Sequence, residues 1–150
     1  MFFVYPALLA GPLGEEVGWR GFALPRLQEL YGPLKASVIL GLLWAFWHSP
    51  IWFSGQWTEP TLVNIGAYVS WIAAVTFIFT WVFNNTGGSV LMAMLLHGSM
   101  DVFPNMLLPH LPAAATMTAV GVLTLYCGLA LGFGLTALLL VVVTRGRLGR

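Results

Sequence analysis

The chain has 150 residues, of which 59% are hydrophobic and only 7% are charged. Soluble domains average about 25% charged residues, so this chain has too few charges to cover a water-facing surface. The composition therefore predicts an integral membrane protein. A net charge of +1 excludes the basic surface that nucleic-acid binding needs, and a single cysteine excludes an internal disulfide framework.

The N-terminal apolar run, residues 2–13, is too short to cross a membrane alone, because a transmembrane helix needs about 20 mostly apolar residues. It could cross only if the helix continued through Glu15, Glu16 and Arg20. The amphipathic pattern of residues 26–35 then predicts a short interfacial helix.

Four later segments are long and apolar enough to cross the membrane: residues 36–53, 62–83, 89–108 and 119–143. The stretches between them contain the Gly, Pro or Asn residues that mark breaks. We therefore predict an all-α fold, a polytopic transmembrane helix bundle with four full spans plus the N-terminal helix. Residues 1–150 would form a single membrane domain.

The basic residues predict the orientation of this bundle. Arg26 and Lys35 precede the first full span, and Arg145, Arg147 and Arg150 follow the last. An even number of spans separates the two clusters, so both should lie on one side of the membrane. The positive-inside rule then predicts that this side, which includes the C-terminus, is cytoplasmic.

Ionisable side chains at membrane depth are costly unless they pair or face water, so they indicate function by default. Three clusters of them lie on three separate predicted helices: Glu15, Glu16 and Arg20; His48; and His97 with Asp101. Bundling would bring the clusters together, because each would otherwise face lipid. Two structural alternatives are that the first cluster merely ends a helix at the headgroups and that the tryptophan-flanked His48 belongs to an aromatic belt.

Helical spacing separates the roles of the two glutamates. Glu16 and Arg20 are spaced i, i+4 and can pair, whereas Glu15 lies about 100° around the helix and is left without that partner. We therefore predict a structural role for Glu16 and a chemical one for Glu15. His97 and Asp101 are also spaced i, i+4, so the carboxylate can hold or polarise the imidazole.

Such groups can hydrolyse a peptide without a covalent intermediate. A carboxylate and an imidazole can deprotonate a water molecule, and a second imidazole with a polar partner can stabilise the resulting oxyanion. The sequence contains no Gly-x-Ser-x-Gly motif and no His-x-x-x-His zinc helix. Glu15, His48 and His97 could still bind zinc, since two histidines and a glutamate form a catalytic ligand set.

Three motifs resemble those of one known family. EEVGWR fits Glu-Glu-x-x-x-Arg, WAFWH resembles Phe-x-x-x-His with Trp44 in place of Phe, and HGSMD resembles His-x-x-x-Asn or Asp. Together they resemble the CPBP family of intramembrane peptidases, which includes CaaX prenyl proteases and bacteriocin-processing enzymes. The motifs occur in the family order between Glu15 and Asp101.

The resemblance implies a role for each residue of the first two motifs. Glu15 is similar to the base that activates water, and His48 to the histidine that works with it. Glu16 and Arg20 match the pair that steadies the site.

In the third motif, His97 and Asp101 match the pair that stabilises the oxyanion. The family resemblance supports a glutamate-dependent mechanism at least as well as a zinc-dependent one, so the metal stays open. We interpret Trp44 as a packing change. The chain starts only 14 residues before Glu15, whereas family members usually carry further upstream helices, so it could be a core fragment.

The leading hypothesis is an intramembrane endopeptidase of a bacterial cytoplasmic membrane, acting on a membrane-associated protein or peptide that could be prenylated and of CaaX type. The alternative is a non-catalytic immunity factor or scaffold of the same fold that binds a peptide or a partner protein. A proton-coupled transporter could use the same buried residues, but such proteins usually show paired repeats or broken helices, which this sequence lacks.

Overall fold

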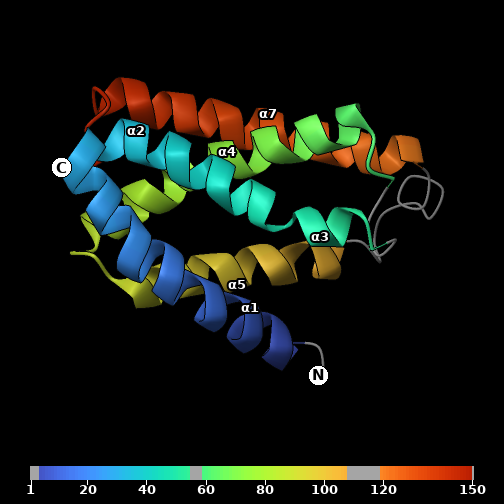
Figure 1. Ribbon diagram of the computed structural model, residues 1–150, viewed down its shortest axis with the longest axis horizontal. Helices are drawn as coiled ribbons and strands as arrows, with labels where there is room; N and C mark the ends of the chain where they lie inside the picture. The colour runs from blue at the N-terminus through green and yellow to red at the C-terminus, as the bar shows by residue number, and fades with distance from the viewer. Residues whose placement is uncertain (1–3, 55–58, 108–118, 150) are drawn as a thin grey trace.

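The computed structural model describes the backbone of residues 4–54, 59–107 and 119–149, and the side chains of residues 11–54, 59–102 and 123–149. Within these ranges all regular secondary structure is helical (Figure 1). Helices α4 (Leu62–Asn85), α5 (Val90–Leu107) and α7 (Ala119–Val143) agree with three of the predicted spans to within two residues at each described end. The fold is the predicted all-α bundle of transmembrane helices.

The N-terminal part of the chain forms one long helical run. Helix α1 (Val4–Gly18) passes through both glutamates into a π-helical turn, η1 (Trp19–Ala23), and continues as α2 (Leu24–Trp47). The helix therefore continues through Glu15, Glu16 and Arg20, as the N-terminal segment requires if it is to cross the membrane.

The chain reverses direction within α2, at Gly32 (Figure 1). Gly32 has φ +74° and ψ 168°, a conformation that glycine adopts without steric cost, and the following Pro33 disfavours a helical residue before it. The predicted interfacial helix at 26–35 is therefore wrong. Residues up to 31 extend the first leg of a hairpin, and the predicted span that begins at 36 is its second leg.

The second leg ends earlier than predicted, at Trp47 rather than at residue 53. His48 ends α2, and a short helix, α3 (Ser49–Trp52), follows it. Within the described residues, three helical segments are long and apolar enough to cross a membrane: Gly11–Trp47, Leu62–Asn85 and Leu123–Val143. Residues Val90–Val102 of α5 form a shorter apolar helix.

The helices pack in pairs, with α1 against α5, and with α4 between α2 and α7 (Figure 1). A close approach of α2 and α4 occurs at Gly41, where an added Cβ would lie 3.0 Å from the Cα of Ala73. The main hydrophobic cluster lies between these helices and includes Trp44, Tyr68 and Phe79. This packing places the second half of α2 beside the part of α1 that carries the glutamates.

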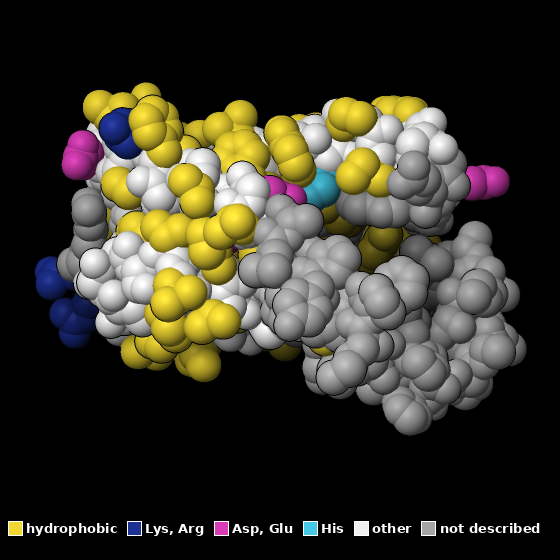
Figure 2. Space-filling view, turned by 90° about the horizontal axis from the view of Figure 1, so that it is seen from below, with side chains coloured by type: hydrophobic (Ala, Val, Ile, Leu, Met, Phe, Trp, Pro, Cys, Tyr) yellow, Lys and Arg dark blue, Asp and Glu magenta, His cyan; other side chains and the backbone are white. Residues whose placement is uncertain are grey.

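The Lys and Arg side chains visible on the surface lie at one end of the molecule (Figure 2). Side-chain contacts tie the two parts of the chain together there: Gln28 and Asn84 exchange hydrogen bonds of 2.8 and 3.1 Å, and Asn84 Nδ2 donates to the carbonyl of Leu148 at 3.0 Å. The two basic clusters, apart from Arg150, which lies outside the described residues, are therefore at the same end of the bundle, as the prediction of a shared side requires. The cytoplasmic placement of that side stays a prediction.

Candidate active site

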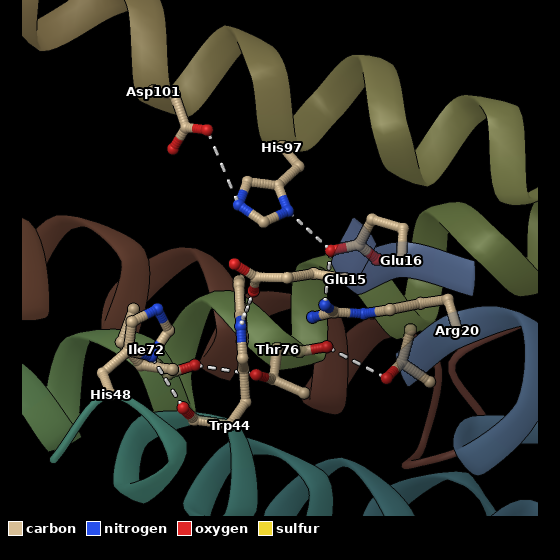
Figure 3. A network of polar contacts seen from close by, with 10 residues as sticks. Glu15, Glu16, Arg20, Trp44, His48, Ile72, Thr76, His97 and Asp101 are labelled. Carbon is tan, nitrogen blue, oxygen red and sulfur yellow. Dashed lines mark hydrogen bonds and ion pairs between the residues drawn. The ribbon is translucent and has the colours of Figure 1, made fainter. Parts of the chain in front are cut away.

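Glu16 is fully buried in an ionic network that links α1, η1 and α5 (Figure 3). Its Oε1 accepts a hydrogen bond from Arg20 Nη1 at 2.8 Å, the i, i+4 pair that the spacing predicted. The same oxygen lies 2.7 Å from His97 Nδ1. Because an ionised carboxylate can only accept, Nδ1 is the donor in this contact. The network therefore joins two elements that are distant in the sequence, and its residues do more than end a helix.

Arg20 is stabilised by aromatic rings as well as by Glu16. Its guanidinium carbon lies 4.3 Å from the ring centroid of Trp44 and 4.0 Å from that of Phe79. A desolvated cation–π contact contributes about 2 kcal/mol. The Nε and Nη2 atoms of Arg20 have no hydrogen-bond partner among the described residues. The buried cation therefore depends on Glu16 and on the two rings.

Glu15 lies in different surroundings from its neighbour. It is only half-buried, and its Oε2 accepts a hydrogen bond of 2.7 Å from Trp44 Nε1. One glutamate of the pair is thus held in the core by a cation, and the other is held nearer the surface by a neutral donor. The separate catalytic and structural roles of the two stay predictions.

His48 lies at the C-terminal end of α2 and is half-buried. Its Nδ1 is 2.8 Å from the backbone carbonyl of Trp44, which can only accept, so Nδ1 donates and Nε2 is the unprotonated nitrogen of the neutral ring. The ring also packs edge-on against Trp47 at a centroid distance of 5.1 Å and against Tyr68 at 5.8 Å. These contacts hold the imidazole in one orientation.

His97 and Asp101 lie one turn apart on α5 and both point toward the glutamates (Figure 3). The distance from His97 Nε2 to Asp101 Oδ2 is 3.7 Å, longer than the roughly 3.2 Å of a hydrogen bond. The closer partner of His97 is Glu16, at 2.7 Å. The sequence predicted an i, i+4 contact with Asp101, but Glu16, 81 residues away along the chain, sets the direction of the ring.

Trp44 is the residue whose importance the sequence did not reveal. Its ring donates to Glu15, lies under the Arg20 guanidinium and packs against His97 at a centroid distance of 5.4 Å. The interpretation as a packing change alone is therefore wrong for this chain. A usable signal was present, because a buried indole N–H usually has an acceptor and Glu15 had no donor partner on its own helix.

The three predicted clusters meet at one site, formed by α1, η1, the second leg of α2 and α5 (Figure 3). Glu16, Arg20 and His97 are buried, whereas Glu15, His48 and Asp101 are half-buried. Acidic and histidine side chains are visible together at the surface, midway between the ends of the molecule (Figure 2). The site is thus partly open at the depth of the hydrophobic region.

The geometry gives no support to a zinc site. Among the described residues, no group of three His, Cys, Asp or Glu side chains is arranged to hold a metal ion. One carboxylate oxygen of Glu15 is already bound to the indole of Trp44. The expected ligand set of Glu15, His48 and His97 is therefore not assembled, and we derive no chemical step through a metal.

Comparison with known families gives the context of this site. The sequence profile of type II CAAX prenyl endopeptidase Rce1-like proteins matches residues 1–103, which include all seven residues of the three motifs. The chain belongs to this Rce1-like family. The resemblance to the CPBP intramembrane peptidases is thereby confirmed, and α7 lies outside the matched region of the Rce1-like profile.

A curated relative of this Rce1-like chain is CAAX prenyl protease 2 of Methanococcus maripaludis. The two are 31% identical over 96 residues, which cover 60% of this chain and 35% of the relative. The chain therefore matches about a third of the length of that protein. No solved structure matches the chain.

Proposed function

We propose that the protein is an intramembrane endopeptidase that hydrolyses a peptide bond of a membrane-associated protein, using water activated by Glu15 and His48. The observation that carries the proposal is the contrast between two adjacent carboxylates. Glu16 is fully buried and paired with Arg20, whereas Glu15 is half-buried and accepts from a neutral indole. Glu15 is therefore the more accessible of the two carboxylates, as a base that acts on a water molecule must be.

In the proposed reaction, a water molecule lies between Glu15 and His48. Glu15 accepts one proton from it while the water oxygen bonds to the carbonyl carbon of the scissile peptide. Nε2 of His48 accepts the other hydrogen of the same water, because Nδ1 already donates to the carbonyl of Trp44. When the carbon–nitrogen bond breaks, Glu15 returns its proton to the leaving amine. No covalent intermediate with the protein forms.

His97 is the proposed donor to the oxyanion, through Nε2. Because Nδ1 donates to Glu16, donation from Nε2 requires a proton on both ring nitrogens. The acidic side chains of Glu16, at 2.7 Å, and Asp101, at 3.7 Å, lie on either side of the ring. A preorganised cationic donor in a water-poor site stabilises the charge that develops on the carbonyl oxygen. Glu16 therefore orients His97, and Asp101 supports its charge.

The substrate class follows from the relative and from the position of the site. The name CAAX prenyl protease 2 supports a prenylated protein of CaaX type as the substrate. A half-buried site midway along apolar helices suits a substrate whose lipid lies in the bilayer. The long apolar helices support a multi-pass membrane protein, and the positive-inside rule supports an orientation with the basic end in the cytoplasm.

The test is cleavage of a fluorogenic farnesylated peptide with a CaaX end by protein in liposomes, with the products identified by mass spectrometry. Glu15→Gln keeps the size and polarity of the side chain but removes the base. We expect kcat to fall by about 10²–10⁴-fold, the usual contribution of general base catalysis. Glu29→Gln, which changes an exposed glutamate on α2, is the matched control and should behave as wild type.

Two results would contradict the proposal. Full activity of Glu15→Gln would show that another group is the base. Binding of the peptide by the wild-type protein without any cleavage would instead support the non-catalytic immunity factor or scaffold.

A further inference from the structure

Trp44 contacts both members of the proposed water-activating pair. Its side-chain Nε1 donates to Glu15 Oε2 at 2.7 Å, and its backbone carbonyl accepts from His48 Nδ1 at 2.8 Å. The residue is only 2% exposed and lies in the main hydrophobic cluster. One buried residue of α2 therefore holds a carboxylate from α1 and an imidazole from the end of its own helix.

The indole is itself fixed in place. One face of its ring lies 4.3 Å from the guanidinium carbon of Arg20, and Phe79 packs against it at a centroid distance of 5.6 Å. His97 approaches the same ring at 5.4 Å. Because these neighbours leave the ring little freedom to rotate, the direction of its N–H bond is set by the packed core.

We propose that Trp44 is a positioning residue that aims the Glu15 carboxylate at the water shared with His48. The inference rests on the proposed function, in which Glu15 is the base. Glutamate has three side-chain torsions, and in a half-buried position little else restricts them. When Oε2 is bound to the indole, Oε1 is the oxygen left to take the proton of the water. Phenylalanine, the residue of the family motif at this position, has no N–H group to give this restraint.

The chain offers a matched pair of variants for the test. Trp44→Phe removes the donor but keeps an aromatic ring in the core. Trp52→Phe makes the same chemical change at another buried residue of the same cluster, 6% exposed, whose Nε1 has no hydrogen-bond partner among the described residues. Any effect of cavity formation alone should therefore appear in both variants, whereas loss of the positioned donor should appear only in the first.

The kinetic readout is kcat and KM for the farnesylated fluorogenic peptide in liposomes. A hydrogen bond to a charged group corresponds to about a ten- to hundredfold effect on rate, so we expect kcat of Trp44→Phe to fall by that factor. KM should stay within about twofold of wild type, because the loss falls on the chemical step rather than on binding. Trp52→Phe should keep the wild-type kcat. Equal kcat values for the two variants, or a change in KM alone, would overturn the positioning role.

A spectroscopic measurement keeps the inference testable if Trp44→Phe folds poorly. In protein labelled with ¹⁵N-tryptophan, the indole N–H signal of Trp44 should move when its acceptor changes from carboxylate to amide in Glu15→Gln. It should not move in Glu29→Gln. An indole signal that is identical in wild type and Glu15→Gln would overturn the inference.

The two proposals can fail separately. If Glu15→Gln remains fully active, the proposed function of Glu15 is wrong whatever the indole signal does. If Glu15→Gln is inactive while Trp44→Phe has the wild-type kcat, the base assignment stands and only the positioning role is wrong.

Discussion

Replacement of Glu16 by glutamine tests whether the buried network depends on a charge. Glu16 is fully buried, and its Oε1 is the acceptor for both Arg20 Nη1 at 2.8 Å and His97 Nδ1 at 2.7 Å. The substitution keeps the shape of the side chain and one acceptor oxygen but removes the negative charge. Arg20, which is also fully buried, then loses the anion to which it is hydrogen-bonded.

The expected loss in the free energy of unfolding follows from this geometry. Removing one partner of a buried ion pair typically costs about 3–5 kcal/mol, because the other charge stays in the low-dielectric interior. The amide oxygen of Glu16→Gln can still accept one hydrogen bond from Arg20, so we expect the lower end of this range, about 3 kcal/mol. The ring contacts of Arg20 with Trp44 and Phe79 are present in both wild type and Glu16→Gln, so they do not change the difference in the free energy of unfolding.

The measurement is the free energy of unfolding in mixed micelles of detergent and dodecyl sulfate, followed by circular dichroism. Glu29→Gln on the exposed face of α2 is the control and should leave stability unchanged. The double variant Glu16→Gln/Arg20→Met should be more stable than Glu16→Gln alone, because it removes the uncompensated cation. A cost below about 1 kcal/mol, or a double variant no more stable than the single one, would refute the buried-pair reasoning.

Two further predictions concern α5 and the topology. Because Asp101 lies 3.7 Å from the nearest His97 nitrogen, it supports charge without a direct hydrogen bond. Asp101→Asn should keep turnover within about tenfold of wild type in the liposome assay, a loss of no more than about 1.4 kcal/mol, because the amide loses the charge but can itself donate to the oxyanion. Asp101→Leu has neither the charge nor a donor and should be nearly inactive. A reporter fused after Arg150 should read cytoplasmic and one inserted in residues 54–61 should read external. Opposite readings in the topology assay, or an inactive Asp101→Asn, would contradict these assignments.

The helices could be predicted because a membrane leaves the backbone few choices. In lipid every backbone N–H and C=O must be bonded within the segment, so a long apolar run forms a helix. This is why α4, α5 and α7 agree with their predicted spans to within two residues at the described ends. The Glu16–Arg20 pair was equally visible, since four residues on a helix bring two side chains together whatever the rest of the chain does.

The hairpin at Gly32 could not be read from the same pattern. Residues 26–35 have an amphipathic sequence, which suits either an interfacial helix or the end of a transmembrane leg. Their place was decided by packing, because Leu24 and Leu40, on opposite legs, lie in one buried cluster. A periodic pattern shows which face of a helix is apolar, but it does not show what covers that face.

Composition and helical spacing were enough to indicate a membrane bundle, the residues of its site and the unequal surroundings of two adjacent glutamates. Only the tertiary structure decided which partners those residues have: Glu16 with His97 across 81 residues, and Glu15 with Trp44 across 29. The physical reason is that a hydrogen bond forms only when the donor and the acceptor are at the right distance, to within a fraction of an ångström, and point toward each other. Between distant segments, that direction is set by how α1, α2 and α5 pack, and no local pattern along the chain contains it.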